Sequence, residues 1–347
     1  MSKVSVIGAG SWGTALALVL ADNGYDVTIW ARRPEIAEEI NSKHTLEDYL
    51  PGVCLPDGIR ASHRLEDALE NVSMVLLVIP SHVFRSTARM IAPLIGKDVT
   101  VAHATKGFDL DSLERMSEVL LSEIPQISPE QAAVLSGPSH AEEVSERYPT
   151  TVVVASVAKH TAEFVQDHFM NGNFRVYTNP DVVGTELGGA LKNIIALGGG
   201  ISDGLGYGDN AKAALMTRGL VEISRLGAAM GASQSTFSGL AGVGDLIATC
   251  TSKHSRNWRA GYMLGQGKTL DETLANMKMV VEGVRTTKAA MLLSRKYQVE
   301  MPITTEIYRV LFEGKAPKDA VDDLMMRGKR HELEDIAKNR FHPKWKM

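Results

Sequence analysis

Short apolar runs alternate with amphipathic segments through the first half of the chain. Val4–Ile7 and Asp26–Trp30 flank the helical pattern Trp12–Asn23, which predicts a strand, a helix and a second strand. Their apolar positions are continuous rather than alternating, as is typical of parallel strands covered on both faces. We expect further strands of the same domain at Met74–Ile79, Val99–Ala104, Ala132–Leu135 and Thr150–Ala155.

The pattern changes after Asn179-Pro180-Asp181, where long helical patterns rich in Ala, Gly, Leu and Met replace the strands. We therefore expect a domain boundary near residue 180, with one domain at 1–180 and another at 181–347. Pro180 is expected in the first turn of a long helix, where its missing N–H costs nothing. The fold class predicted is an α/β Rossmann-type dinucleotide-binding domain followed by an all-α C-terminal domain, with a cleft between them.

Composition narrows the class of protein. With 347 residues, 44% hydrophobic and 22% charged, the chain is globular and long enough for two cores. A net charge of −4 gives no support to nucleic-acid binding, so any anion site must be local. The two cysteines share no metal-ligand spacing with the histidines, and no metal site is predicted. No signal peptide or membrane span is apparent, and we expect a cytoplasmic protein.

A glycine-rich loop, Gly8-Ala9-Gly10-Ser11-Trp12-Gly13, joins the first predicted strand to the first helix. This is the context in which G-x-G-x-x-G binds a dinucleotide. Gly8 permits the tight turn, Gly10 lets the backbone approach a pyrophosphate, and Gly13 lets the helix pack on the strand. The helix N-terminus then presents N–H groups to the phosphates. An ordinary strand-to-helix turn is the alternative.

The end of the second strand bears on which dinucleotide binds. NAD-specific domains tend to carry an acidic residue there, but this chain has Arg32 and Arg33 and no carboxylate until Glu35. Two guanidinium groups suit a 2′-phosphate and an adenine face. NADP is therefore favoured over NAD, unless the arginines merely form a solvated turn.

Lys192 lies in a predicted helix among small and apolar residues. Its helical face includes Thr185, Gly188, Gly189, Ala196 and Gly199. Because glycine costs about 1 kcal/mol in a helix, several together need a reason. They serve either close helix packing or a ligand lying beside an amine that donates a proton.

Other candidate groups follow strands or crowd into one short segment. Lys106 and the turn Ser136–Ser139 each follow a strand, at the edge of a parallel sheet where ligands bind, although solvated turns would look the same. Ser255, Arg256 and Asn257 supply donors suited to a phosphate group, unless they form a solvated loop. Asp245 either orients a catalytic lysine or caps the helix expected from Leu246.

In this order the motifs resemble the bacterial NAD(P)-dependent glycerol-3-phosphate dehydrogenases, and the likeness covers nearly the whole chain. The resemblance implies a C-terminal domain of the 6-phosphogluconate-dehydrogenase-like kind. The chain departs from the family pattern at Thr105 and His140. The segments that carry the likeness are Gly8–Gly13, Thr105–Phe108, Ser136–Ala141, Glu186–Ala196, Gly239–Asp245, Ser255–Asn257, Val280–Gly283 and Met301–Ile303.

The resemblance also implies roles for single residues. Lys192 is the catalytic acid and base. The substrate site is implied to comprise Lys106, Gly137, Ser139, Lys192, Asp245, Ser255, Arg256 and Asn257. The cofactor site is implied to comprise Gly8, Gly10, Ser11, Trp12, Gly13, Arg32, Arg33, Tyr49, Lys106, Ala141, Arg256, Val280 and Glu282.

The expected reaction is the reversible reduction of dihydroxyacetone phosphate to sn-glycerol 3-phosphate by NADPH or NADH, which supplies the backbone of glycerophospholipids. Lys192 would stabilise the developing oxyanion and donate a proton. Alternatives are a β-hydroxyacid dehydrogenase or ketopantoate reductase, which needs a carboxylate clamp, and a nucleotide-sensing protein, which does not need the lysines. Met277, Met279 and Met291 fit either a core or the interface of a homodimer.

Overall fold

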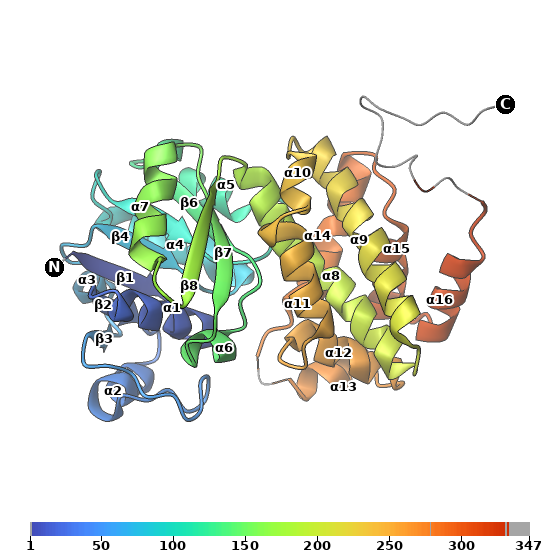
Figure 1. Ribbon diagram of the computed structural model, residues 1–347, viewed down its shortest axis with the longest axis horizontal. Helices are drawn as coiled ribbons and strands as arrows, with labels where there is room; N and C mark the ends of the chain where they lie inside the picture. Colours follow the sequence, from blue (N-terminus) through green and yellow to red (C-terminus); the bar gives the residue numbers. More distant parts are fainter. Residues whose placement is uncertain (1, 278, 330–331, 333–347) are drawn as a thin grey trace.

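The computed structural model describes residues 2–277, 279–329 and 332 of the chain. Two units lie side by side: a sheet with helices on both faces, and a bundle of helices (Figure 1). The predicted fold class, a Rossmann-type domain followed by a helical domain, is confirmed. The C-terminal part of the described chain contains helices and no strand after residue 179.

Eight strands of the described chain form one sheet in the order β3-β2-β1-β4-β5-β6-β7-β8. Neighbours β1 and β4 are not consecutive in the chain, so the topology switches between them, and such switch points open a crevice at the carboxyl ends of the strands. The strands are β1 Lys3–Ile7, β2 Asp26–Trp30, β3 Ile59–Ser62, β4 Met74–Leu77, β5 Thr100–His103, β6 Ala132–Ser136, β7 Thr150–Ala155 and β8 Phe174–Asn179.

The sheet differs from the prediction in two respects. β7 pairs antiparallel with β6, so the sheet is only mostly parallel. Strands β3 and β8, at its two edges, were not predicted. β3 is four residues long, and β8 begins with alternating buried and exposed side chains rather than a continuous apolar run. Edge strands cover less core, and their sequences therefore lack the signal that marks the central strands.

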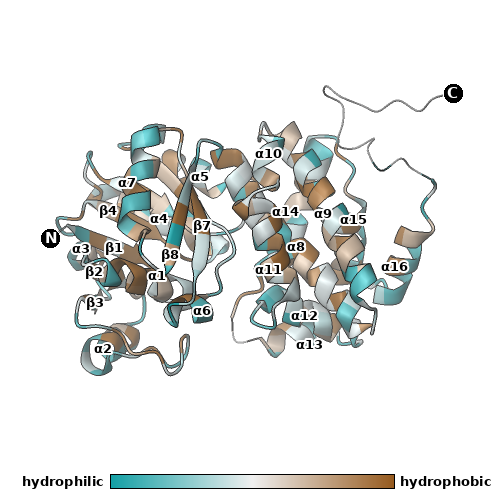
Figure 2. Cartoon of the chain, viewed as in Figure 1, coloured by the Kyte–Doolittle hydropathy of each residue, from teal (hydrophilic) through white to brown (hydrophobic). Residues whose placement is uncertain are grey.

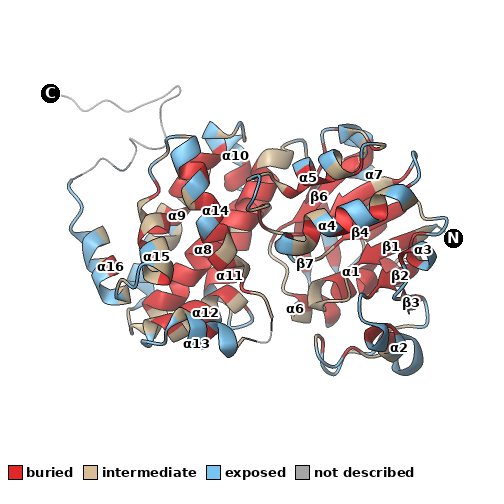
Figure 3. Ribbon diagram, turned by 180° about the vertical axis from the view of Figure 1, so that it is seen from behind, coloured by how far each residue is buried: buried red, intermediate tan, exposed pale blue. Residues whose placement is uncertain are grey.

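Helices cover both faces of the sheet and form the second unit. Figure 2 shows apolar residues gathered in the sheet, and Figure 3 shows the sheet and the centre of the bundle buried. In the first unit the helices are α1 Ser11–Asp22, α2 Pro34–Lys43, α3 Leu65–Ala68, α4 Ser81–Ile91, α5 Met116–Glu123, α6 Ala141–Ser145 and α7 Lys159–Phe169. The second unit has α8 Val182–Gly204, α9 Asp209–Ala229, α10 Gln234–Phe237, the π-helical turn Leu240–Gly244, α11 Asp245–Thr251, α12 Arg256–Gly265, α13 Leu270–Ala275, α14 Glu282–Lys296, α15 Pro302–Phe312 and α16 Pro317–Met325.

Helix α8 is the centre of the second unit, and every residue from Gly184 to Ser202 is buried. The expectation that Pro180 lies in its first turn is wrong. The helix begins at Val182 because the Asp181 carboxylate caps it, accepting the N–H of Gly184 at 2.8 Å. Pro180 precedes this cap and lies outside the helix.

The glycines of α8 let other backbones approach the helix. A Cβ on Gly188 would lie 2.2 Å from the carbonyl oxygen of Ala241, and one on Gly200 would lie 2.0 Å from that of Trp258. Neither residue could be replaced by alanine without moving a neighbouring helix. Of the two readings of these glycines, close packing is the one that the structure supports. No helix among the described residues is both long and apolar enough to cross a membrane.

Candidate active site

The glycine loop between β1 and α1 has the geometry that its sequence predicts. Gly8 has φ +126°, a conformation that favours glycine, and a Cβ there would lie 2.4 Å from the carbonyl oxygen of Val78. A Cβ on Gly13 would lie 2.1 Å from the Gly8 carbonyl oxygen, so α1 can pack on the loop only with glycine here. Nothing lies within 4 Å of a Cβ built on Gly10, which leaves the space that a pyrophosphate needs.

Three residues expected around the cofactor meet beside this loop. The Ser11 hydroxyl donates to the carbonyl oxygen of Tyr49 at 2.7 Å, and Arg33 donates to the Tyr49 hydroxyl at 3.3 Å. Arg33 and the neighbouring Arg32 are exposed at the end of β2. The partly buried Trp12 packs against the hydrophobic core of the first unit. Cationic groups thus stand beside the loop and can approach a bound nucleotide.

A second group of predicted residues converges on one buried carboxylate. Lys192 of α8 donates to Asp245 Oδ1 at 2.5 Å and to the Thr249 hydroxyl at 2.5 Å. Lys106, three residues after β5, donates to Asp245 Oδ2 at 2.7 Å and lies 3.4 Å from the Gly137 carbonyl oxygen. Asp245 therefore joins a lysine of the first unit to a lysine of the second.

The role of Asp245, left open by the sequence, follows from these contacts. Asp245 is the first residue of α11, and the N-cap position before it is occupied by Gly244, so Asp245 does not stand at the cap position that the sequence suggested. Asp245 is 1% exposed, and its carboxylate forms ion pairs with the two lysines. Thr249, one turn further along α11, completes the Lys192 contacts and was not predicted. The four-residue spacing from Asp245, which places both on one helix face, was the available signal.

Burial and charge shift the pKa values of this group. Burial and the nearby Lys106 charge outweigh Asp245 and lower the pKa of Lys192 to about 8. Burial alone would raise the pKa of Asp245, but the two ammonium groups hold it below its usual range. The Asp245 carboxylate is therefore ionised at neutral pH, and Lys192 titrates close to neutrality. A lysine with such a pKa can both donate and accept a proton under ordinary conditions.

The turn after β6 lies beside the lysines. Gly137 has φ +129°, and its carbonyl oxygen accepts the Ser139 hydroxyl at 3.0 Å as well as facing Lys106. Ala141 begins α6 directly after this turn. The His140 ring lies 3.2 Å from the carbonyl oxygen of Ala248 in α11, so the turn contacts the helical domain.

The segment expected to hold a phosphate group is partly occupied by contacts within the protein. Ser255 caps α12 by accepting the N–H of Trp258 at 3.2 Å. The Asn257 amide donates to Asn193 Oδ1 at 2.9 Å, and its oxygen accepts the N–H of Gly283 at 2.8 Å. The solvated-loop reading is wrong, because Ser255 and Asn257 are buried. Asn193, the residue after Lys192, belongs to this network and was not predicted.

Arg256 is the charged member of that segment. It donates to the carbonyl oxygen of Val280 at 3.2 Å, and burial lowers its pKa below the ordinary value. The neighbouring residues bridge the two units: Met279 Sδ lies 3.9 Å from the Ser11 hydroxyl, and both Glu282 carboxylate oxygens accept from Ser81 at the start of α4. Arg256 and Glu282 thus lie on the side of the helical domain that faces the nucleotide domain.

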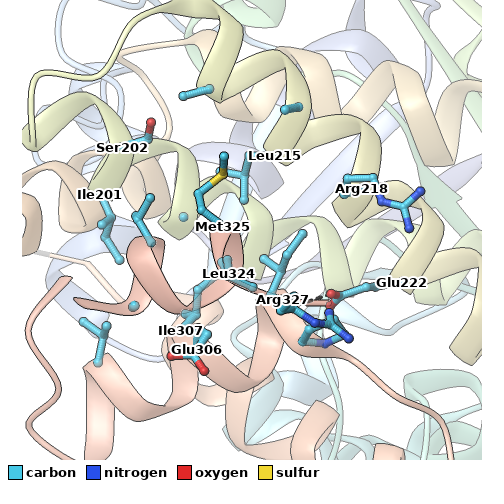
Figure 4. Close-up of a pocket in the computed structure, with 18 of the residues that line it drawn as sticks. Ile201, Ser202, Leu215, Arg218, Glu222, Glu306, Ile307, Leu324, Met325 and Arg327 are labelled. Atoms are coloured by element: carbon cyan, nitrogen blue, oxygen red, sulfur yellow. Dashed lines mark hydrogen bonds between the residues drawn. The ribbon is translucent and has the colours of Figure 1, made fainter. Parts of the chain in front are cut away.

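A separate cavity of about 300 Å³ lies in the helical domain between α8, α9, α15 and α16 (Figure 4). None of the predicted site residues lines it. Glu222 does, and burial raises the pKa of this carboxyl to about 7. Among the residues that the structure describes, no cluster of His, Cys, Asp or Glu could hold a metal ion.

Known proteins resemble this chain over nearly its whole length. Residues 3–162 match the family model for the N-terminus of NAD-dependent glycerol-3-phosphate dehydrogenase, and residues 181–322 match that for its C-terminus. Glycerol-3-phosphate dehydrogenase [NAD(P)+] of Bacillus cytotoxicus is 60% identical over 97% of this chain and 98% of its own. The Bacillus pumilus enzyme of the same name is 57% identical over 97% and 98%. A crystal structure of glycerol-3-phosphate dehydrogenase from Coxiella burnetii superposes with a TM-score of 0.90 at 40% identity, covering 94% of this chain and 99% of that one.

Proposed function

The chain belongs to the NAD-dependent glycerol-3-phosphate dehydrogenase family, and on that premise we propose that its interdomain site interconverts dihydroxyacetone phosphate and sn-glycerol 3-phosphate. The observation that carries this proposal is the contact of Lys106 and Lys192 with the buried carboxylate of Asp245. Lys192, whose pKa is lowered to about 8, lies where the carboxyl ends of β5 and β6 meet the helical domain, which supports its proposed role as the proton donor. The product supplies the backbone of glycerophospholipids.

The cofactor is NAD or NADP, and the glycine loop fits its pyrophosphate because the space over Gly10 is open. When bound, the nicotinamide supplies or accepts the hydride. Arg32 and Arg33 favour NADPH, since a guanidinium pairs well with a 2′-phosphate. The remaining cofactor contacts proposed are those of Gly8, Ser11, Trp12, Gly13, Tyr49, Lys106, Ala141, Arg256, Val280 and Glu282.

Lys192 acts as the acid in the reduction direction. Its ammonium stabilises the charge that develops on the C2 oxygen and then donates a proton to it; in the oxidation direction the neutral amine accepts that proton. Asp245 holds the Lys192 ammonium in place, and burial and the charge of Lys106 keep the pKa of Lys192 low. This assignment requires Lys192 to exchange Asp245 or Thr249 for the substrate oxygen during turnover.

Arg256 is the anchor for the substrate phosphate, because its guanidinium can bind two oxygens and has one hydrogen bond to a described residue. Ser255 and Asn257 support it through the start of α12, where an anion also meets the helix N-terminus. Gly137 and Ser139 line the opposite side of the site. Binding energy from the phosphate fixes the orientation of the reacting carbon.

Lys192→Ala tests the proposal. We expect reduction of dihydroxyacetone phosphate to fall below about one hundredth of the original kcat, the usual contribution of a general acid, while NADPH affinity stays within about twofold. The matched control is Lys212→Ala, which removes a lysine paired with Asp203 at 2.7 Å in the same domain and should leave kcat unchanged. Near-normal turnover by Lys192→Ala would refute the assignment. Dihydroxyacetone phosphate, glyoxylate and ketopantoate, compared with both cofactors, test the substrate class.

The domain boundary at residue 180, a cytoplasmic location and a homodimer are also proposals. β8 ends at Asn179 and α8 begins at Val182, which supports a division there. Limited proteolysis, cell fractionation and light scattering test the three in turn.

A further inference from the structure

Helix α8 carries a second buried charge, Glu186, six residues before Lys192. Its carboxylate accepts the Ser117 N–H at 2.8 Å and the Ser117 hydroxyl at 2.7 Å. Arg115 donates to the same carboxylate at 2.5 Å, and His103 Nε2 lies 3.2 Å away. Glu186 is only 7% exposed, and its carboxylate has several charged and polar partners. The contact is therefore a buried hydrogen-bonded ion pair rather than an ion pair at the surface.

All of these partners belong to the nucleotide domain. His103 is the last residue of β5, and Ser117 lies in the first turn of α5, where a carboxylate meets free N–H groups. Glu186 therefore holds the beginning of α8 against the carboxyl end of β5. The contact does not involve Lys192, Lys106 or Asp245.

The charge of Glu186 is maintained at working pH. Burial alone would raise its pKa, but the adjacent His103 ring, the Arg115 guanidinium and the Ser117 hydroxyl lower it to about 2. Removing the charge would leave Arg115 buried with Glu118 as its other ionic partner among the described residues.

The position of this contact decides how the two lysines meet. Lys106 follows His103 by three residues, and Lys192 follows Glu186 by about 9 Å along the rigid helix. The Glu186 contact thus holds together the beginnings of the two segments, 103–106 and 186–192, whose lysines both contact Asp245. Gly189, between Glu186 and Lys192, packs so closely that a Cβ there would lie 2.6 Å from Ser136 Oγ in β6.

We propose that Glu186 is a positioning residue of the active site, which sets the separation of Lys106 and Lys192 by holding α8 against β5 and α5. The proposal rests on the proposed function, because it requires Lys192 to be the acid. Without the contact, α8 shifts against the sheet and water reaches Lys192. A displacement of about 1 Å at a reacting group can cost about a hundredfold in rate.

Glu186→Gln tests this, with Glu222→Gln as the matched control. Glu222 is 3% exposed and likewise binds a helix N-terminus, accepting the N–H groups of Ile303 and Thr304 at 2.6 and 3.1 Å. It lies at the cavity of Figure 4, and its contacts stay within the helical domain. Both variants lose a buried carboxylate that binds a helix start, but only Glu186 connects the two units.

We expect Glu186→Gln to lower kcat at least about tenfold, with NADPH affinity within about twofold, because no Glu186 contact involves the glycine loop. Since burial is the main influence lowering the pKa of Lys192, the alkaline limb of the pH profile should move to higher pH. Glu222→Gln should leave kcat and the limb unchanged. The position of the alkaline limb is the decisive measurement. A smaller fraction of folded enzyme would lower the rate at every pH but would not change the pH at which the limb falls.

A limb that stays in place or moves to lower pH in Glu186→Gln would overturn the proposal. If Glu186→Gln does not fold, Ser117→Ala tests the proposal instead, because it removes one hydrogen-bond donor to Glu186 and keeps the charges. We expect the alkaline limb of Ser117→Ala to move to higher pH, with a smaller loss of kcat. A limb that does not move in this variant would overturn the proposal. Wild-type enzyme is measured in the same assay. If it does not reduce dihydroxyacetone phosphate at all, the proposed function has failed, which is a different result from normal behaviour of the Glu186 variants.

Discussion

Neutralising Asp245 should change the pH at which the enzyme works. Asp245→Asn keeps the shape of the side chain but removes the negative charge that Lys106 and Lys192 share. Of the influences on Lys192, the carboxylate is the one that raises its pKa, against burial and the Lys106 charge. Its removal must therefore lower that pKa below the value of about 8.

The size of the shift follows from the distances. A full opposite charge within hydrogen-bonding distance moves a pKa by about 1 to 3 units. The pKa of Lys192 in Asp245→Asn is thus expected at roughly 5 to 7. At pH 7 the protonated fraction of Lys192 falls from about nine-tenths to between about one half and one hundredth. A stronger acid donates its proton faster, which offsets part of the loss, so the position of the limb is a sharper prediction than the rate.

The assay is kcat/KM for dihydroxyacetone phosphate at saturating NADPH between about pH 5.5 and 10. The reduction rate should be flat below the Lys192 pKa and fall about tenfold per pH unit above it, because only the protonated amine donates. In Asp245→Asn the break should lie about 1 to 3 units lower. This is opposite in sign to the shift expected for Glu186→Gln.

Asp203→Asn is the control. Asp203 also lies on α8 and pairs with a lysine, Lys212, at 2.7 Å, but it is not among the contacts of Lys192. Its removal should leave the break where the wild type has it. If Asp245→Asn shows the wild-type break, either Lys192 is not the titrating acid or Asp245 does not set its pKa, and the mechanism proposed for the site is refuted.

Three further predictions concern the ligands. Arg256→Ala should raise KM for dihydroxyacetone phosphate about 10- to 100-fold, the worth of charge-assisted hydrogen bonds, whereas the exposed Arg259→Ala should not; equal effects in steady-state kinetics would place the phosphate elsewhere. Arg33→Ala should raise KM for NADPH about tenfold and leave KM for NADH nearly unchanged, with Arg64→Ala as the exposed control; a parallel rise for both cofactors would contradict a 2′-phosphate contact. Gly13→Ala places a methyl group 2.1 Å from a carbonyl oxygen, so a lower Tm and weaker NADPH binding by fluorescence titration are expected, and normal values for both would contradict the packing argument.

The parts of the fold that the sequence predicts are those whose signal is local. The glycine loop is recognisable because two of its glycines have local reasons: a Cβ on Gly8 would meet Val78 after β4, and a Cβ on Gly13 would meet Gly8 within the same loop. The central strands β1, β2 and β4 are recognisable because they are buried on both faces and are therefore apolar throughout. β3 and β8 lack that property and were missed.

The sequence singled out polar residues for the site by their type, but their hydrogen-bond partners could not be read from it. Ser255 and Asn257 carry donors that suit a phosphate, yet one caps α12 and the other joins α8 to α14. A hydroxyl or amide binds whichever buried group the folded chain brings to it, since an unpaired one is costly. Ser255 binds Trp258, three residues away, but the partners of Asn257 are Asn193 and Gly283, each more than 20 residues from it in the sequence.

The charge of the site could be predicted from the sequence better than its hydrogen bonds could, provided that the charges of the candidate residues are summed separately from those of the whole chain. The chain as a whole has a net charge of −4, whereas Lys106 and Lys192 leave one net positive charge around the buried carboxylate of Asp245. Burial, together with the nearby Lys106 charge, lowers the pKa of Lys192. On the proposed assignment, a substrate whose phosphate binds at Arg256 adds negative charge to the interdomain site, and we expect this charge to raise the pKa of Lys192. We therefore expect the proposed site to favour an anionic substrate, whose charge helps to keep Lys192, the proposed acid, protonated for the step in which the proton is needed.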